Sequence, residues 1–126
     1  MDITIEFPGG DRVDAVMDGV RLVTEQDGSA ASPFQLFLAS IGTCAGIYVL
    51  GFCRQRGLPT DDIRLTQRLR VDPATGMVAG IDIDIQVPPG FPEKYHAALV
   101  RSAEQCAVKK HMEAPPRFSV RTVTTG

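Results

Sequence analysis

The chain has 126 residues, a length that fits one domain, and we expect a single domain over residues 1–126. Hydrophobic residues make up 44% of the sequence and charged residues 22%, which are ordinary values for a soluble globular protein. The formal net charge of −2 provides no strong field of either sign, so the composition argues against a nucleic-acid partner.

The cysteines and the apolar segments indicate the compartment. Three cysteines are an odd number without the close paired spacing of a zinc site or of a disulfide framework, and they favour a reduced cytoplasm. The N-terminal residues alternate like a strand and lack the pattern of a secretory signal. Residues 32–53, which belong to the longest uncharged run (residues 28–53), are near the length of about 20 residues that a membrane span needs, but Ser, Gln, Thr and Gly dilute them. We interpret this run as a buried core helix and expect no membrane partner.

Three short strands are predicted at the N-terminus. Residues 2–7, 12–17 and 20–24 alternate apolar and polar side chains, as half-buried strands do. Asp18-Gly19 separates the second run from the third and is a good hairpin signal. Residues 26–31 are expected to form a loop.

A long helix is predicted next, from Pro33 to about Arg56. Ser32 can cap its N-terminus, and Pro33 fits the first helical position. Gly57 can adopt the left-handed conformation that stops a helix, and Pro59 prevents continuation. The helix is about 35 Å long, and its apolar residues extend most of the way round, so it must be buried on nearly all sides. Because one small sheet covers only one face, we expect a second copy of the chain to cover the other.

The rest of the chain is predicted as a hairpin, two helices and a strand. Residues 63–71 and 77–87 flank a turn, and the second run alternates strictly. A helix begins at Pro92, a short helical turn covers about residues 106–112, and residues 118–124 close the chain as an edge strand or a returning strand. Strands and helices are segregated in blocks, which favours an α+β fold over a parallel α/β sheet.

Cys44 and Cys106 are candidates for redox chemistry, because thiols on two different helices can meet across a packed interface. A thiol reacts as the thiolate, so Cys44, deep inside its helix, needs a cation or a hydrogen-bond donor from elsewhere in the fold. Cys53 lies nine positions after Cys44, about half a turn further round the helix, and points to the opposite face. Taken alone, each cysteine is also compatible with a packing role, because free cysteine is among the most buried residue types.

Several short motifs together resemble the OsmC/Ohr family, thiol-dependent peroxidases that reduce organic hydroperoxides. They are Ser32-Pro33 at the start of the long helix, Leu36-Phe37, and Cys44 eleven positions after the proline. Cys106-Ala107-Val108 resembles the second-cysteine motif of the family, which is usually Cys-Pro-Val or similar. The predicted order of elements also agrees, from about residue 1 to residue 124.

The resemblance implies an OsmC-like α+β fold, with an antiparallel sheet packed on a long central helix in an intertwined homodimer. It implies that Cys44 is the peroxidatic thiolate, which attacks the O–O bond and becomes a sulfenic acid. Cys106 is then the resolving thiol, which forms a Cys44–Cys106 disulfide that an external dithiol reduces. No metal and no bound cofactor are needed, and the implied role is in the response to oxidative stress.

Two further functional residues of the family are matched only in part. The family has an activating arginine after the first strand, often in a Gly-Gly-Arg string. Here Gly9-Gly10-Asp11-Arg12 makes Arg12 the candidate, displaced by one residue, with Arg21 in reserve. The family's glutamate beside the helix-opening proline is absent, since Phe34 and Gln35 follow that proline. Gln35 is its neutral replacement, which can hydrogen-bond an arginine but cannot hold it by charge.

Two other interpretations fit the sequence. The chain can be a non-catalytic relative, in which the dimer encloses an apolar pocket near Phe34, Phe37 and Tyr48 for a small hydrophobic ligand. It can also be a structural or interaction domain without a site, in which case Cys44 is fully packed.

Overall fold

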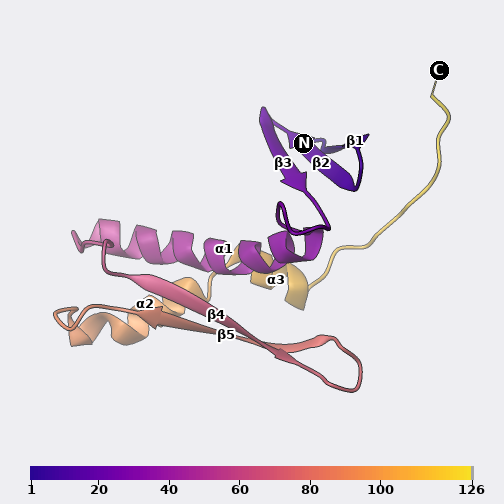
Figure 1. Ribbon diagram of the computed structural model, residues 1–126. Helices are drawn as coiled ribbons and strands as arrows, with labels where there is room; N and C mark the ends of the chain where they lie inside the picture. Colours follow the sequence, from indigo (N-terminus) through magenta and orange to yellow (C-terminus); the bar gives the residue numbers. More distant parts are fainter. Residues whose placement is uncertain (126) are drawn as a thin grey trace. The chain divides into compact units, whose positions relative to one another are not determined.

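The computed structural model describes residues 1–125, which form two compact units. The first unit is Met1–Ser40, and the second begins at Ile41. Within the described residues, three strands are followed by a long helix, two strands and three short helices (Figure 1). All strand pairs are antiparallel, so the α+β class predicted from the sequence is confirmed.

The first unit contains a sheet in the order β1-β2-β3. Strand β1 is Thr4–Gly9, β2 is Arg12–Met17 and β3 is Val20–Thr24. Asp18 and Gly19 connect β2 to β3 with φ values of 43° and 78°, the positive values that a type I′ turn requires. The three predicted strands and their Asp-Gly hairpin turn are therefore confirmed.

The pairing register separates an apolar face of this sheet from a polar face. Ile5 pairs with Ala15, and Ala15 pairs with Leu22, so these three side chains share one face. Ile5 and Leu22 remain 52% and 38% exposed in the single chain. The opposite face carries Asp14, which is fully buried and ion-paired.

Helix α1 is Pro33–Gln55 and has a capping structure at each end. At the N-terminus, the Gln35 N–H donates to Ser32 Oγ at 3.2 Å, and the Ser32 N–H donates to Gln35 Oε1 at 2.9 Å. This reciprocal pair is a capping box. At the other end, Gly57 has a φ of 64°, which confirms the predicted glycine stop.

Only one side of α1 is buried in the single chain. The buried residues recur mostly at three- and four-residue intervals and are Ile41, Ala45, Val49, Phe52 and Cys53. Elsewhere on the helix, Ile47 is 66% exposed and Tyr48 is 36% exposed. The elements of one chain cover only this stripe, so burial of α1 on nearly all sides, with a second copy of the chain over the other face, stays a prediction. By length and composition α1 could also cross a membrane, a property it shares with core helices of soluble proteins.

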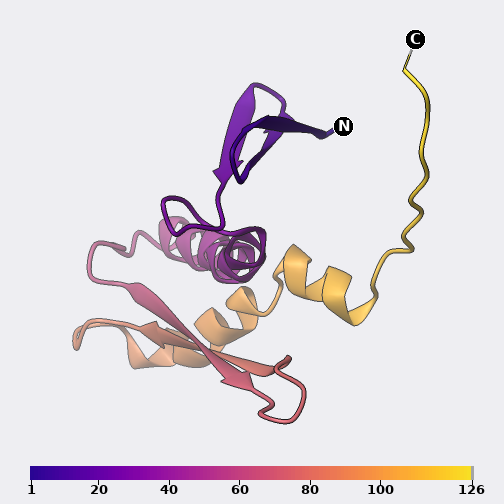
Figure 2. The same ribbon diagram turned by 45° about the vertical axis from the view of Figure 1, so that its right-hand side comes forward.

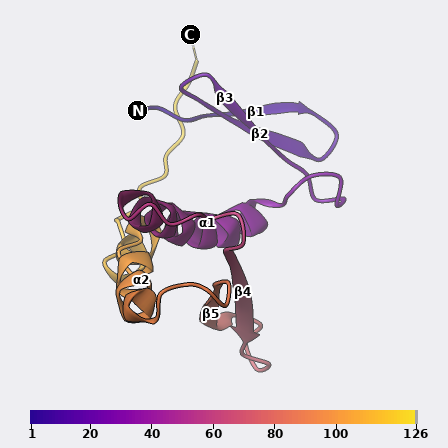
Figure 3. The same cartoon turned by 90° about the vertical axis from the view of Figure 1, so that its left-hand side faces the viewer.

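The second unit contains a long hairpin that lies along its part of α1. Strand β4 is Arg64–Val71 and β5 is Val78–Gln86. In Figures 1 and 3 the hairpin lies below the helix, and α2 lies beside the hairpin. The outer face of the hairpin carries two cross-strand ion pairs, Arg68–Asp84 and Arg70–Asp82. The polar residues of the alternating pattern thus lie on the outer face, and Ile81, Ile83 and Ile85 lie on the opposite face.

Three short helices complete the unit: η1 (Glu93–Tyr95), α2 (His96–Ala103) and α3 (Ala107–Glu113). Figure 2 shows α3 following α2 after a short bend. The core of the unit is formed where α1 meets α2 and the loop before η1, by Val49, Phe52, Cys53, Phe91 and Leu99.

The predicted closing strand at residues 118–124 is wrong for the single chain. Residues 115–125 have no regular secondary structure, and Phe118 and Val120 are 87% and 95% exposed. A strand needs a neighbour for its backbone N–H and C=O groups, and within the described residues none pairs with this segment. The alternation of side chains therefore predicted a strand, but the described part of the chain has no neighbouring strand with which this segment pairs.

Candidate functional site

Cys44 and Cys106 come together in the second unit although they are far apart in the sequence. Cys44 lies on α1 and is partly exposed, at the N-terminal end of α3. The backbone groups of Val108 and Ala107 hydrogen-bond to its sulfur, and the Cys106 side chain does so too. The two thiols are therefore neighbours in this unit, and their redox role stays a prediction. The reading that requires a fully packed Cys44 does not fit its partial exposure.

Cys106 is held on both sides. Its side chain is 2% exposed, and it occupies the N-cap position of α3. The Lys109 N–H donates to Cys106 Sγ at 3.4 Å, and Cys106 Sγ donates to the Ile41 carbonyl oxygen at 3.8 Å. A sulfur here takes the place of the serine or aspartate oxygen that usually caps a helix. Both cysteines are free thiols.

The pKa of the Cys44 thiol is lowered from its ordinary value. The largest cause is the hydrogen bond from the Val108 backbone, and burial opposes it by disfavouring the charged form. The Cys106 side chain and the Ala107 backbone add to the lowering. The sequence required a cation or a hydrogen-bond donor from elsewhere, and α3 supplies donors. A thiol with these neighbours is more reactive than an ordinary cysteine, because the thiolate is the nucleophile.

Cys53 has the opposite environment. Its side chain is 0% exposed in the core of the second unit, and burial raises the pKa of its thiol, with a smaller opposing effect from Arg56. The helical spacing correctly separated this packing cysteine from Cys44.

Arg12 and Gln35 belong to the first unit, where each has partners. Arg12 donates through Nε and Nη2 to the two carboxylate oxygens of Asp14, each at 2.8 Å. Arg21 donates to Asp14 and to Glu6, also at 2.8 Å. These contacts lower the pKa of Asp14 to about 2, chiefly through the hydrogen bond from Arg12. Gln35 contributes to the capping box of α1. A role for Arg12 or Gln35 in thiol chemistry stays a prediction.

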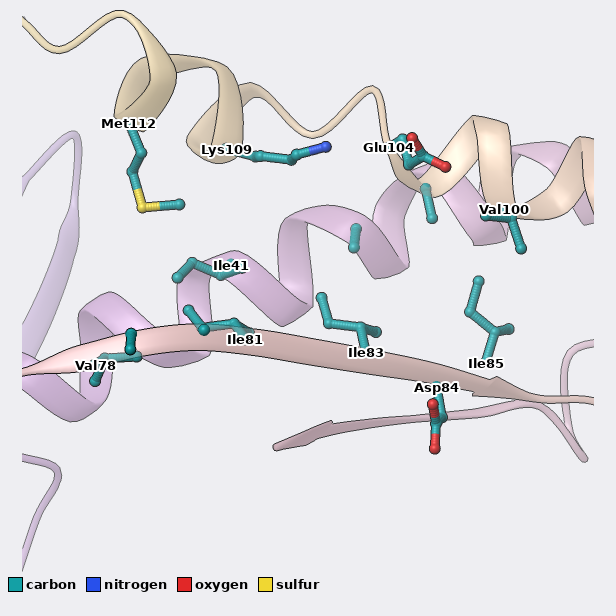
Figure 4. A pocket seen from close by; sticks show the side chains of 14 residues that line it. Ile41, Val78, Ile81, Ile83, Asp84, Ile85, Val100, Glu104, Lys109 and Met112 are labelled. Atoms are coloured by element: carbon teal, nitrogen blue, oxygen red, sulfur yellow. The ribbon is translucent and has the colours of Figure 1, made fainter. Parts of the chain in front are cut away.

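A groove of about 750 Å³ lies in the second unit between α1, β5, α2 and α3. Figure 4 shows Ile81, Ile83 and Ile85 projecting from β5 on one side, toward Ile41 of α1 and the helices above. Lys109 and Met112 of α3 form part of its opposite wall. This groove is not the pocket predicted near Phe34, Phe37 and Tyr48, because none of those residues lines it.

Sequence reasoning missed two features of these units. The first is the effect of the Ala107 and Val108 backbone on the pKa of Cys44, which no side-chain motif predicts. The short helix predicted directly after Cys106 was the only indication of it. The second is Asp14 between two arginines, which the spacing of Arg12 and Asp14 on one face of a strand could have indicated. Among residues 1–125 no three His, Cys, Asp or Glu side chains are grouped so that they could hold a metal ion.

The fold and the thiol pair define an α+β protein with two neighbouring cysteines, and comparisons identify the family. Residues 26–121 match the family described as OsmC-like protein. The chain therefore belongs to the OsmC-like family, and the resemblance to OsmC/Ohr proteins drawn from its motifs is confirmed. No curated protein matches the sequence.

Two solved structures share the fold of this chain, and a third is less similar. A protein from Psychrobacter arcticus, described as an osmotic stress induced and detoxification response protein, has a TM-score of 0.70 at 17% identity, covering 86% of this chain and 85% of that chain. A hypothetical protein from Aquifex aeolicus has a TM-score of 0.66 at 15% identity, covering 90% and 87%. The organic hydroperoxide resistance protein OhrB of Bacillus subtilis has a TM-score of 0.49 at 20% identity, covering 91% and 93%.

Proposed function

We propose that the protein is a thiol-dependent peroxidase that reduces organic hydroperoxides. One observation carries the proposal: Cys44 and Cys106 are neighbours at the N-terminal end of α3, where the Lys109 N–H donates to Cys106 Sγ at 3.4 Å and the α3 backbone, together with Cys106, lowers the pKa of Cys44. Two cysteines with separate packing roles would not be expected to lie together at the N-terminus of one helix. Membership in the OsmC-like family supports the same chemistry.

The proposed reaction has two steps on the protein. The Cys44 thiolate attacks one peroxide oxygen, the O–O bond breaks, and the alcohol leaves after taking up a proton, so that Cys44 becomes a sulfenic acid. The Cys106 thiol then attacks the Cys44 sulfur, water leaves, and a disulfide forms. An external dithiol restores both thiols by exchange. No metal or bound cofactor takes part.

Arg12 is the proposed activating arginine and Gln35 the neutral replacement for the family's glutamate. Arg12 is held by a bidentate pair with Asp14, so this chain has a carboxylate for its arginine, on the strand and not on the helix. Arg21, the reserve candidate, contacts the same Asp14, so the two arginines can be compared directly. If Arg12 acts on the thiol, Arg12→Ala should slow peroxide reduction more than Arg21→Ala does. A larger effect of Arg21→Ala would assign the role to Arg21, and equal effects would contradict a role specific to Arg12.

We further propose an intertwined homodimer. The apolar face of the β1-β2-β3 sheet and the exposed residues of α1 support it, because a sheet with one apolar face needs a second layer. Phe7 on β1 is 81% exposed and Ile47 on α1 is 66% exposed. Large apolar side chains are mostly buried in folded proteins, so both surfaces are candidates for burial by a second chain. Sedimentation equilibrium should give twice the mass of the chain, and a monomer at micromolar concentration would contradict the proposal.

A second candidate function is binding of a small hydrophobic ligand without catalysis. The groove favours it, because its volume and its isoleucine-rich wall are those of ordinary ligand pockets. Cys44→Ser distinguishes the two functions. A binding protein keeps its ligand affinity in this variant, whereas a peroxidase loses its activity.

The direct test is turnover of an alkyl hydroperoxide with a dithiol reductant. Cys44→Ser should lose activity entirely, and Cys106→Ser should lose the dithiol-driven cycle after one equivalent of peroxide. Cys53→Ala is the matched control and should keep the wild-type rate. Equal turnover by the wild type and Cys44→Ser would refute the proposed function.

A further inference from the structure

The first turn of α3 is capped by sulfur atoms from two different helical segments. The first N–H groups of any helix have no carbonyl partner within the helix. In α3 the Lys109 N–H donates to Cys106 Sγ at 3.4 Å, and the backbones of Ala107 and Val108 hydrogen-bond to Cys44. The Cys106 sulfur therefore caps Lys109, and the Cys44 sulfur lies at the backbone of Ala107 and Val108.

Few other contacts hold this helix. It has seven residues, none of them buried, and is far shorter than a helix that is stable in isolation. The contacts that tie this segment to α1 include the Cys106 thiol against the Ile41 carbonyl at 3.8 Å. At the same time, Cys106 is only 2% exposed, so a reductant cannot reach its sulfur while α3 stays in place.

We propose that formation of the Cys44–Cys106 bond uncaps α3, so that its first turn opens and admits the reductant to the Cys106 sulfur. The inference rests on the proposed function for its natural oxidant and reductant, an organic hydroperoxide and a dithiol. The observations behind it are the sulfur caps, the exposure of α3 and the burial of Cys106.

The chemistry explains why the caps are lost. When the Cys106 thiol condenses with the Cys44 sulfenic acid, an S–S bond forms, the S–O bond breaks, and the Cys106 proton leaves in water. The Cys44 sulfur can no longer carry the negative charge that attracts N–H groups at a helix N-terminus. The Cys106 sulfur loses its S–H, and with it the hydrogen bond to Ile41. Each sulfur must also turn toward the other to reach bonding distance, about 2 Å.

Opening of α3 also changes the groove. Lys109 and Met112 belong to its wall and lie on α3, whereas Ile41 lies on α1 and the isoleucines opposite lie on β5. The oxidised protein should therefore have a wider groove that leads toward the disulfide. Reduction restores the caps of α3 and returns Lys109 and Met112 to the groove wall. It also restores the hydrogen bonds that lower the pKa of Cys44, so the conformation of α3 depends on the redox state of the two cysteines.

The test uses an oxidant that does not depend on peroxidase activity. Diamide, an azo compound, takes two electrons and two protons from a pair of thiols and leaves a disulfide, which peptide mapping assigns. Amide hydrogen exchange is then compared between the reduced and the oxidised full-length protein. Loss of caps worth about as much as ordinary N-caps predicts exchange at Ala107 to Lys109 that is roughly fivefold faster or more after oxidation. Trypsin gives a second reading, with faster cleavage after Lys109 and Lys110 and unchanged cleavage after Arg117 in the exposed C-terminal segment.

Two variants separate uncapping from the disulfide itself. Cys106→Ser keeps a capping oxygen and cannot form the bond, so α3 should stay protected after diamide treatment. Cys106→Ala removes the cap, so exchange should be fast already in the reduced protein. Equal protection of α3 in the reduced and the oxidised wild type overturns the proposal. So does a pair of thiols that diamide fails to join, because sulfurs this close should pair. Uncapping by diamide without peroxide turnover would uphold this inference while the peroxidase proposal fails.

Discussion

An ester in place of the Val108 amide would remove a single N–H group from the thiol site and keep the side chain and the carbonyl. The chain suits this change, because Cys106 provides a ligation point at which a synthetic peptide of residues 106–126 can be joined to residues 1–105. We expect the pKa of Cys44 to rise, since the Val108 backbone is the largest cause of its lowering. The same ester at Val120, in the exposed C-terminal segment, is a chemically matched control.

The size of the effect follows from the contact. A hydrogen bond to a charged group contributes about 1.5–3 kcal/mol, and the partial exposure of Cys44 reduces this to about 1 kcal/mol. Below the pKa, such a loss lowers the ratio of thiolate to thiol by roughly fivefold. The assay is the rate of alkylation of Cys44 by iodoacetamide as a function of pH, followed by mass spectrometry of the peptide that contains it. The Val108 ester should alkylate more slowly near neutral pH and reach its plateau at higher pH.

One result would refute this reasoning. If the Val108 ester, the Val120 ester and the all-amide protein give the same pH profile, the α3 backbone does not activate Cys44. The activating group would then have to be sought among side chains, with Arg12 as the first candidate.

Three further predictions concern stability. The pKa of Asp14 is lowered from 3.8 to about 2, so its ion pairs stabilise the fold above pH 3.8, and this contribution is lost as the pH falls through about 2. In urea titrations between these pH values, the free energy of unfolding of the wild type should fall by more than that of Asp14→Asn. Cys53→Ser places a hydroxyl in the core and should lower the free energy of unfolding by about 1–3 kcal/mol, measured by chemical denaturation, while Cys44 alkylation stays unchanged. Leu99→Ala should cost about 2–5 kcal/mol in the same measurement, and a smaller loss would mean that the core of the second unit relaxes around the cavity.

The features that the sequence predicted well are local ones. Asp18-Gly19 marked its hairpin because few residue pairs adopt two successive positive φ values. Ser32-Pro33 and Gly57 marked the ends of α1 because capping involves only neighbouring residues. The half-turn between Cys44 and Cys53 correctly assigned one thiol to the core, because helical geometry fixes their relative direction.

The remaining features depend on contacts between segments that are distant in sequence. No property of Cys44 itself indicates that its hydrogen-bond donors are the backbone groups of Ala107 and Val108. The groove is lined by residues of four elements, and no local pattern in the sequence marks that lining. Residues 118–124 have the alternation of a strand, but alternation reports which side chains could share a face and not whether a partner strand is present.

The measurement that tests the central claim most directly is disulfide mapping after addition of one equivalent of an alkyl hydroperoxide. We predict a Cys44–Cys106 disulfide in the wild type and a Cys44 sulfenic acid, trapped by dimedone, in Cys106→Ser. Cys53 should remain a free thiol in both. A wild-type protein whose Cys44 and Cys106 both remain reduced, or a Cys106→Ser protein oxidised only at Cys53, would contradict the account.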